Sequence, residues 1–226
     1  TDKGIVSLFD PRQKKILWTW TSKAGIENTP SVGDNYEDGT RSLVIDDEDG
    51  NVYYLKINEK GTNLQWTQSL HIPITTSPVL EDFNQDKVLD VTVGCSDGKI
   101  YVLDGRSGKV LNKFEIPSKS RVASTPAVSD INQDGIPEII IGGEDHRIYA
   151  FSENWNSPLS YKTNGEIKQS PVITSLTSKH DFQVICVSKD NNAYLWEPLN
   201  GYVTTVFSLD STPSISPIIA DINQDG

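Results

Sequence analysis

Residues 77–114 read SPVLEDFNQDKVLDVTVGCSDGKIYVLDGRSGKVLNKF, four short apolar runs separated by turns. Asp97-Gly98 and Ser107-Gly108 each separate two such runs. Glycine at these places accepts the positive φ that tight hairpin turns require. An acidic loop, residues 82–90, separates the first run from the second. The segment therefore predicts a four-stranded antiparallel sheet made of consecutive hairpins, which is the form of a propeller blade.

The same pattern returns along the whole chain, and each copy opens with a Ser/Thr-Pro pair. The pairs are Thr29-Pro30, Ser77-Pro78, Thr125-Pro126, Ser170-Pro171 and Ser216-Pro217, spaced 48, 48, 45 and 46 residues apart. A fixed period of this length built from short strands is typical of β-propellers. We therefore predict an all-β chain, a β-propeller of four-stranded antiparallel blades with about five blades' worth of sequence.

The period divides the chain into four whole units and one split unit. We expect a single β-propeller domain over residues 1–226, with blades at about 28–70, 76–116, 124–163 and 169–208 and a split blade from 215–226 plus 1–21. Two arrangements follow, a ring of five blades closed by both termini or an arc of a larger propeller. The chain begins in mid-repeat and ends in mid-motif, so we interpret it as a piece of a longer protein.

Aromatic residues recur at two positions of the repeat. One position holds Tyr53, Tyr101, Tyr149 and Tyr194, and the other holds Trp20, Trp66, Phe114, Tyr161 and Phe207. Large flat rings fill the wedge between splayed sheets. We therefore predict that both sets pack between blades rather than form a platform for a ligand.

Composition excludes several classes of partner. The formal net charge is −11 and no Lys/Arg-rich block is present, so nucleic acid is not an expected partner. No apolar run approaches the roughly 20 residues of a membrane span. Cys95 and Cys186 lie at equivalent points two repeats apart, too far around a propeller for a disulfide. We expect both to be buried, free thiols.

The acidic loop of the third unit, residues 130–138, alternates oxygen-bearing residues with others. Counted from Asp130, positions 1, 3, 5 and 9 carry carboxylate or amide oxygens, position 6 is a glycine that permits a sharp bend, and position 7 offers its backbone carbonyl. Ca²⁺ takes six to eight oxygen ligands, and alternating ligands on a tight turn can surround it. We predict a Ca²⁺ site formed by Asp130, Asn132, Asp134, Ile136 and Glu138. Ile131 lies between ligands and is expected to enter the core.

Two further loops repeat this pattern. The second unit offers Asp82, Asn84, Asp86, Val88 and Asp90, and a third copy begins with Asp221, Asn223 and Asp225. Lys87 stands where the third unit has its bend glycine, and we expect it to weaken the site of the second unit. The corresponding loops of the first and fourth units lack the ligand pattern, so no tight site is expected there. We predict that the ions are structural and fix the turn between the first two strands.

These motifs resemble two families of propeller repeats. Asp-x-Asn-x-Asp-Gly-x-x-Glu at 130–138, between two strands, resembles the FG-GAP repeat of integrin-α-like propellers. Asp-Gly-Lys-Ile-Tyr-Val-Leu-Asp at 97–104, followed by Ser-Gly-Lys-Val at 107–110, resembles the quinoprotein-like repeat. The FG-GAP resemblance implies Ca²⁺ in the acidic loops. The adjacent Cys-Cys pair of quinoprotein dehydrogenases is absent, so redox activity is not expected.

No catalytic motif is present. The chain has no Gly-x-Ser-x-Gly, no glycine-rich phosphate loop and no two histidines at metal-ligand spacing. We expect a non-catalytic, calcium-binding interaction or adhesion module that binds a protein or glycan on a propeller face. The alternatives are a structural subunit of a surface layer or filament, self-associating through open blade edges, or an accessory domain of a polysaccharide-active enzyme. Sites of this ligand count suit millimolar Ca²⁺, which favours a secreted, cell-surface or periplasmic protein.

Overall fold

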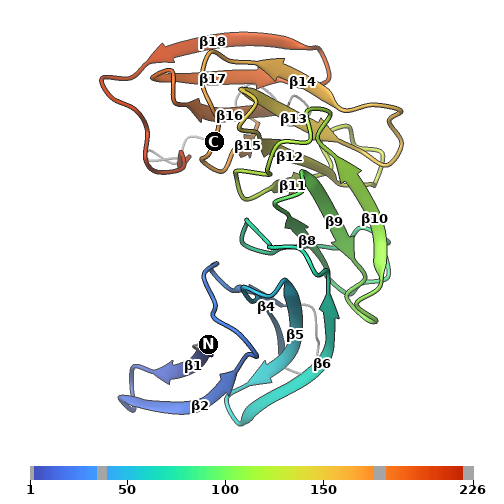
Figure 1. The fold of residues 1–226 in the computed structure, drawn as a ribbon, viewed down its shortest axis with the longest axis vertical. Coiled ribbons are helices and arrows are strands. Elements are labelled where there is room, and N and C mark those ends of the chain that lie inside the picture. Colours follow the sequence, from blue (N-terminus) through green and yellow to red (C-terminus); the bar gives the residue numbers. More distant parts are fainter. Residues whose placement is uncertain (1–2, 35–39, 176–181, 221–226) are drawn as a thin grey trace. The chain divides into compact units, whose positions relative to one another are not determined.

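The computed structural model describes residues 3–34, 40–175 and 182–220. The chain forms two compact units, Thr1–Glu115 and Ile116–Gly226, and each is described by itself (Figure 1). All regular structure in the described residues is β-strand. Over the same residues, no helix is long and apolar enough to cross a membrane.

The first unit contains one hairpin and two four-stranded antiparallel sheets. The hairpin pairs β1 (Ile5–Asp10) with β2 (Lys15–Thr21). Blade one consists of β3 (Ser31–Gly33), β4 (Arg41–Asp46), β5 (Asn51–Asn58) and β6 (Gly61–Ser69). Blade two consists of β7 (Val79–Glu81), β8 (Asp90–Gly94), β9 (Lys99–Leu103) and β10 (Val110–Glu115).

The second unit contains two more sheets of the same kind. Blade three consists of β11 (Ala127–Ser129), β12 (Glu138–Gly142), β13 (Arg147–Phe151) and β14 (Leu159–Lys162). Blade four consists of β15 (Val172–Thr174), β16 (Gln183–Ser188), β17 (Asn192–Glu197) and β18 (Tyr202–Ser208). In every blade each strand pairs antiparallel with the next along the chain. The predicted class, an all-β propeller of four-stranded antiparallel blades, is confirmed.

The predicted single domain and its split blade stay predictions. The split blade joins residues of both units, and residues 221–226 lie outside the described part of the chain.

Blade one buries apolar side chains on both of its faces. Leu43 and Ile45 belong to a core cluster that also contacts Trp20 of the hairpin. Val44, which lies between them in β4, joins a second cluster with Val91 of blade two. Successive side chains of a strand point to opposite faces, so an uninterrupted apolar run serves two neighbours at once. The hairpin, blade one and blade two are therefore bound together through the faces of their sheets.

Blades three and four share a core of the same kind. Ile140 and Ile148 of blade three lie in one cluster with Tyr194 and Trp196 of blade four. Cys186 belongs to this cluster and is buried, and Cys95 in the first unit is buried as well. Both cysteines are free, as predicted.

The predicted packing of aromatic rings between neighbouring sheets is confirmed at two pairs. Trp20 of the hairpin meets Tyr53 of blade one edge-on, with ring centroids 4.9 Å apart. Tyr161 of blade three meets Tyr194 of blade four at 5.7 Å. Phe207 in β18 differs, because its side chain is 60% exposed. No sheet follows blade four within the described residues of the second unit, so the face that carries Phe207 is uncovered there.

Trp66 connects blade one to the turn between β9 and β10 of blade two. Its ring stacks on Tyr54 at 5.1 Å, and its indole N–H donates to the carbonyl of Gly105 at 2.8 Å. A Cβ on Gly108 would lie only 2.7 Å from the Trp66 ring, and Gly108 has φ +71°. Both the backbone angle and the close approach of the ring therefore require glycine at this position.

Hydrogen bonds connect the Ser/Thr-Pro pairs of neighbouring repeats. The hydroxyl of Ser77 accepts from the backbone N–H of Thr29 at 3.1 Å, and that of Ser216 accepts from Ser170 at 3.0 Å. Ser31 donates to the carbonyl of Pro78 at 2.5 Å. The innermost strands of the blades have only three residues each, so these side-chain bonds supply contacts that a short ladder lacks.

Candidate functional site

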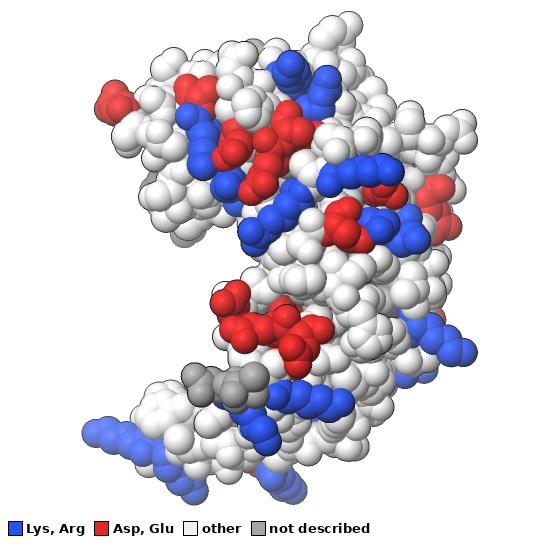
Figure 2. Space-filling view, viewed as in Figure 1, with Lys and Arg blue, Asp and Glu red and all other residues white. Residues whose placement is uncertain are grey.

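Charged side chains form clusters of both signs on the surface (Figure 2). In the second unit, the Lys168 ammonium lies 3.0 Å from Glu144 and 3.3 Å from Glu166, and Lys189 lies 2.8 Å from Glu166. These residues lie in the β12–β13 hairpin, in the β16–β17 hairpin and in the segment between the two blades. Glu144 and Glu166 are thus paired with two lysines within the protein, so these two carboxylates are not left as free charges for a ligand.

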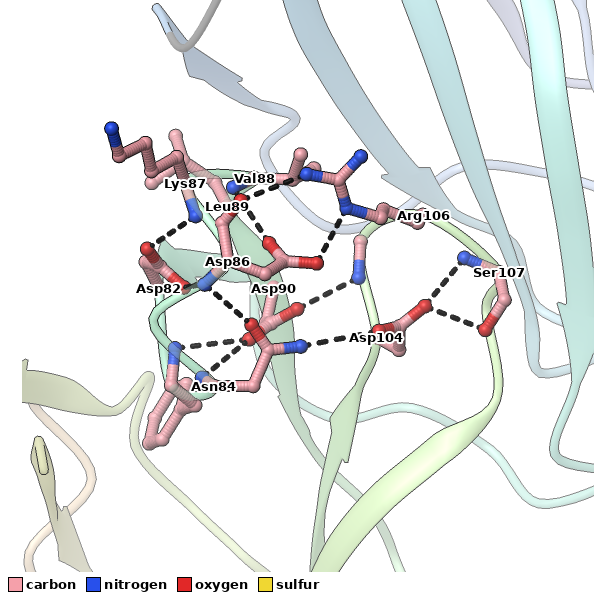
Figure 3. A network of polar contacts seen from close by, with 12 residues as sticks. Asp82, Asn84, Asp86, Lys87, Val88, Leu89, Asp90, Asp104, Arg106 and Ser107 are labelled. Carbon is pink, nitrogen blue, oxygen red and sulfur yellow. Dashed lines mark hydrogen bonds and ion pairs between the residues drawn. The ribbon is translucent and has the colours of Figure 1, made fainter.

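The acidic loops lie at the opposite end of each blade from those hairpins. We call residues 82–90, between β7 and β8, loop two, and residues 130–138, between β11 and β12, loop three. In a sheet whose strands pair in chain order, the connection between the first two strands and that between the last two lie at the same end. The turn between the last two strands of a blade, which we call its outer turn, spans residues 104–109 in blade two and 152–158 in blade three. Each acidic loop therefore lies beside the outer turn of its own blade, as Figure 3 shows for loop two.

In loop two the side chains at positions 1, 3 and 5 accept backbone N–H groups of the same loop (Figure 3). Asp82 accepts from Asp86 at 3.0 Å and from Lys87 at 2.8 Å. The Asn84 carbonyl oxygen also accepts from the Asp86 N–H at 3.0 Å, and the Asp86 carboxylate accepts from Val88 at 2.8 Å. These bonds hold the turn, because a compact loop otherwise leaves its N–H groups without partners.

Asp90, at position 9, joins loop two to the outer turn of blade two. Its side chain is fully buried. One carboxylate oxygen accepts from Phe83 at 2.9 Å and from Asn84 at 3.3 Å, and the other accepts from Gly105 at 2.8 Å. Burial raises the pKa of Asp90 to about 6, although these N–H groups act in the opposite direction.

Loop three repeats this arrangement. Asp130 accepts from Asp134 at 3.1 Å and from Gly135 at 2.9 Å. Asn132 accepts from the same Asp134 N–H at 2.8 Å, and Asp134 accepts from Ile136 at 2.9 Å. Loops two and three are therefore two copies of one local structure.

Glu138 takes the place of Asp90 in loop three. It is fully buried, and burial raises the pKa of its carboxyl group. One of its oxygens accepts from the Ile131 N–H at 2.9 Å, and the other accepts from the Asn132 amide at 3.0 Å. The Ile131 side chain is 1% exposed and lies in the core shared by blades three and four, as predicted.

The backbone of both loops bends twice through the left-handed region. At position 6, Gly135 has φ +90° and Lys87 has φ +69°. At position 4, Gln133 and Gln85 have φ of +61° and +58°. A residue with a Cβ pays roughly 1 kcal/mol or more in this region. The bend at position 6 was predicted from the glycine, but the bend at position 4 has no sequence signal because glutamine stands there in both loops.

Three residues that contact the loops from the outer turns were not predicted from the sequence. The Asn84 amide donates to Asp104 at 3.2 Å. Arg106 donates from Nε to the Asp86 carboxylate at 2.5 Å and from Nη2 to the Asp86 backbone carbonyl at 2.8 Å. In loop three, the Asn154 amide donates to the Asp134 carboxylate at 3.1 Å. Arg106 and Asn154 are 48 residues apart, so the period of the repeat, combined with the pairing order of the strands, identifies both positions.

The donor chemistry of both loops fits Ca²⁺, which binds carboxylate, amide and backbone carbonyl oxygens. The positions predicted as ligands lie on one short turn in each loop. Among the described residues, however, no three His, Cys, Asp or Glu side chains are arranged so that they could hold a metal ion. Binding would therefore require the amide and carbonyl oxygens as well, and the carboxylates retain lone pairs beyond those that accept the loop N–H groups.

Asp221, Asn223 and Asp225, the start of the third predicted site, lie outside the described residues. The same holds for residues 35–39 and 176–181, which belong to the corresponding loops of blades one and four.

The repeated four-stranded blade with buried faces defines a β-propeller repeat protein. The family model described as outer membrane protein assembly factor BamB matches residues 1–204. The chain belongs to this family, and the predicted quinoprotein-like repeat is thereby confirmed.

Solved structures share the fold. BamB from Moraxella catarrhalis has a TM-score of 0.66 at 19% identity, over 92% of this chain and 57% of that one. BBS1N, in a crystal of its complex with ARL6DN, has a TM-score of 0.59 at 16% identity, over 84% of this chain and 56% of that one. The chain thus spans little more than half the length of these structures. Comparison with curated proteins gives no match.

Two adjacent buried carboxylates at the end of β4, outside the acidic loops, differ in the number of hydrogen bonds that they accept. Asp46 accepts one hydrogen bond, from the Asn28 amide at 2.7 Å, and its other oxygen is buried without a partner. Burial raises the pKa of Asp46 to about 6. Asp47 accepts from the backbone and amide of Asn51 and from the Tyr53 hydroxyl, at 2.6 to 3.1 Å.

Replacement of Asp46 by asparagine should make the protein more stable at neutral pH. The folded-state pKa of about 6 lies above the ordinary 3.8, so the folded protein holds this proton more tightly than the unfolded chain. The stability that this bound proton confers on the fold is fully present below the unfolded-state pKa of 3.8 and is lost as the pH rises through about 6. The Asp46→Asn variant should lose this pH dependence and gain about 1–3 kcal/mol at pH 7 in urea unfolding.

Asp47→Asn is the matched control and should lower stability by about 2 kcal/mol, because it places an amide where several donors converge. Equal effects of the two substitutions, or an unchanged pH profile in Asp46→Asn, would contradict this assignment.

Proposed function

We propose that this chain is a non-catalytic β-propeller that binds a protein partner through the loops at the ends of its blades. The observation that carries the proposal is the family match over residues 1–204, to proteins named for outer membrane protein assembly. The short strands form a regular framework, and the connecting loops lie at the ends of the blades. Loops held by a rigid scaffold are common sites of binding.

The surroundings of the titratable groups support a role without catalysis. Each carboxylate of loops two and three that accepts backbone N–H groups serves to hold the turn. Burial raises the pKa of Cys95 and of Cys186 to about 12, so both thiols stay protonated and are poor nucleophiles.

A protein is a better candidate partner than a glycan. BBS1N, which shares the fold, was crystallised in complex with ARL6DN, and BamB is named as an assembly factor. We further propose that the chain works in the periplasm or at the cell surface, in keeping with the name of its family. An adhesion role of the FG-GAP type is a narrower form of this proposal and rests on the motif at residues 130–138.

We also propose that Ca²⁺ binds loop three and, more weakly, loop two. Two buried carboxylates, Asp90 and Glu138, have pKa values raised by burial, and a bound cation would favour their ionised forms. The ion would be structural: its ligands lie on the turn that joins the two innermost strands of the blade.

Ca²⁺ should raise the thermal midpoint of unfolding relative to chelator, and Mg²⁺ should do so less. A ligand that binds only the folded state at about 100 times its Kd stabilises by about 2.7 kcal/mol. The double variant Asp130→Asn/Asp134→Asn should lose most of this shift, whereas Asp210→Asn, an exposed residue of the same unit, should keep it. A midpoint that does not respond to Ca²⁺ in the unaltered protein would remove the calcium proposal.

Cross-linking in the native cell tests the binding role. A photo-reactive amino acid is placed at Asp49, in the β4–β5 hairpin at one end of a blade, or at Gln85, in loop two at the other end. At least one of these two positions should give a discrete, protease-sensitive cross-linked product. The same group at Gln65, on the exposed side of outer strand β6, should give none and serves as the control. Absence of adducts at both ends, or equal adducts at all three positions, would contradict a protein-binding role.

A further inference from the structure

Loops two and three share their backbone course but differ in the residue that reaches position 5 from the outer turn. In loop two this residue is Arg106, and in loop three it is Asn154. Both contact the carboxylate of the fifth-position aspartate, Asp86 or Asp134. A positively charged group therefore occupies loop two at a place where loop three has a neutral amide.

Arg106 contacts Asp86 at two points. Its Nε lies 2.5 Å from the carboxylate, and its Nη2 donates to the backbone carbonyl of the same residue at 2.8 Å (Figure 3). The planar guanidinium donates in fixed directions, and a pair of charge-assisted bonds is stronger than neutral ones. The Arg106 side chain is 60% exposed and that of Asp86 is 28% exposed, so the pair is open to screening by salt.

The two loops also differ in the charge around this contact. Loop two has Asp104 in its outer turn, bonded to the Asn84 amide, whereas the residue 48 positions later is Ser152. The aspartates at positions 1 and 5 are common to both loops, and position 9 is a carboxylate in both. Loop two also carries Lys87 at position 6, where loop three has Gly135, and the outer turn of blade three carries Glu153 next to Asn154. Loop two and its turn therefore contain two positive charges, Lys87 and Arg106, at positions where loop three has Gly135 and Asn154.

We propose that Arg106 is the built-in counter-cation of loop two: it fixes this loop without metal, and the neutral Asn154 leaves loop three as the copy that takes Ca²⁺. The second half of this statement rests on the calcium binding proposed above. The first half concerns the metal-free protein and stands independently of it.

Electrostatics and geometry both favour this assignment. A Ca²⁺ ion at position 5 of loop two would lie beside the guanidinium, and like charges a few ångströms apart repel even in water. The guanidinium also uses Asp86 oxygen that the ion would need. In loop three, the Asn154 amide can leave the Asp134 carboxylate without the loss of an ion pair.

The test is a reciprocal exchange of the two residues, Arg106→Asn and Asn154→Arg, with Ca²⁺ binding followed by isothermal titration calorimetry. The unaltered protein should bind one ion tightly. Arg106→Asn should add a second site or tighten loop two by about tenfold, and Asn154→Arg should weaken loop three by about tenfold. Arg12→Asn removes one exposed positive charge in the same unit, at the turn after β1, and should change neither.

A second measurement in chelator does not involve calcium. Without metal, Arg106→Asn should lower the thermal midpoint by about 1–4 °C, and this loss should shrink in 0.5 M salt. Asn154→Arg should raise the midpoint or leave it unchanged. Circular dichroism of each variant establishes that it is folded before binding is compared.

The outcomes separate the two proposals. Arg106→Asn with an unaltered midpoint in chelator and an unaltered number of bound ions would overturn the role of Arg106, whatever the unaltered protein binds. If neither the unaltered protein nor Arg106→Asn binds Ca²⁺, the calcium proposal fails, and with it the assignment of Ca²⁺ to loop three. A salt-sensitive loss of stability in Arg106→Asn would then still support the role of Arg106 in the metal-free loop. Equal affinities of both loops in the unaltered protein would overturn the assignment of Ca²⁺ to loop three.

Discussion

Burial of blade one on both of its faces is the constraint from which the rest of the first unit follows. Val44 packs toward blade two while its neighbours Leu43 and Ile45 pack toward the β1–β2 hairpin. A sheet with two apolar faces cannot be shielded from water by itself, so blade one depends on both of its neighbours. Blades three and four share a core in the same way. Trp66 reinforces this dependence, because its ring and its N–H both reach the outer turn of the following blade.

The packed sheets explain how the acidic loops at the ends of the blades keep their conformation. Strands fixed on both faces hold the two ends of each loop, and the loop then needs only to satisfy its own N–H groups. Asp82 and Asp130 do this in the same way at equivalent positions. The buried Asp90 goes further and ties its loop to the outer turn through Gly105. Under the proposed function, loops preformed in this way would bind a partner at little entropic cost.

Much of the fold was predictable because it rests on period and pattern. Asp97-Gly98 and Ser107-Gly108 identified two of the turns of blade two, and the alternation around Ile131 predicted its place in the core. The loop residues at positions 1, 3, 5 and 9 were recognised because their oxygens recur at one register.

What the sequence did not reveal depends on contacts between segments distant along the chain. Arg106 lies 20 residues after Asp86, and no local pattern indicates that the two meet. The left-handed turn at Gln85 is imposed by the hydrogen bonds around it rather than by its own preference. The unpartnered oxygen of Asp46 likewise follows from the packing around it, which leaves Asn28 as its donor.

Gly108→Ala, measured by urea unfolding, tests most directly whether the blades depend on one another through this packing. The added methyl group would meet the Trp66 ring, whereas at Gly201, which has nearly the same φ of +72°, nothing lies within 4 Å. The account predicts a loss of about 3 kcal/mol or more for Gly108→Ala and about 1 kcal/mol for Gly201→Ala, with part of the larger loss recovered when Trp66 is replaced by leucine. Equal losses at the two glycines would contradict it.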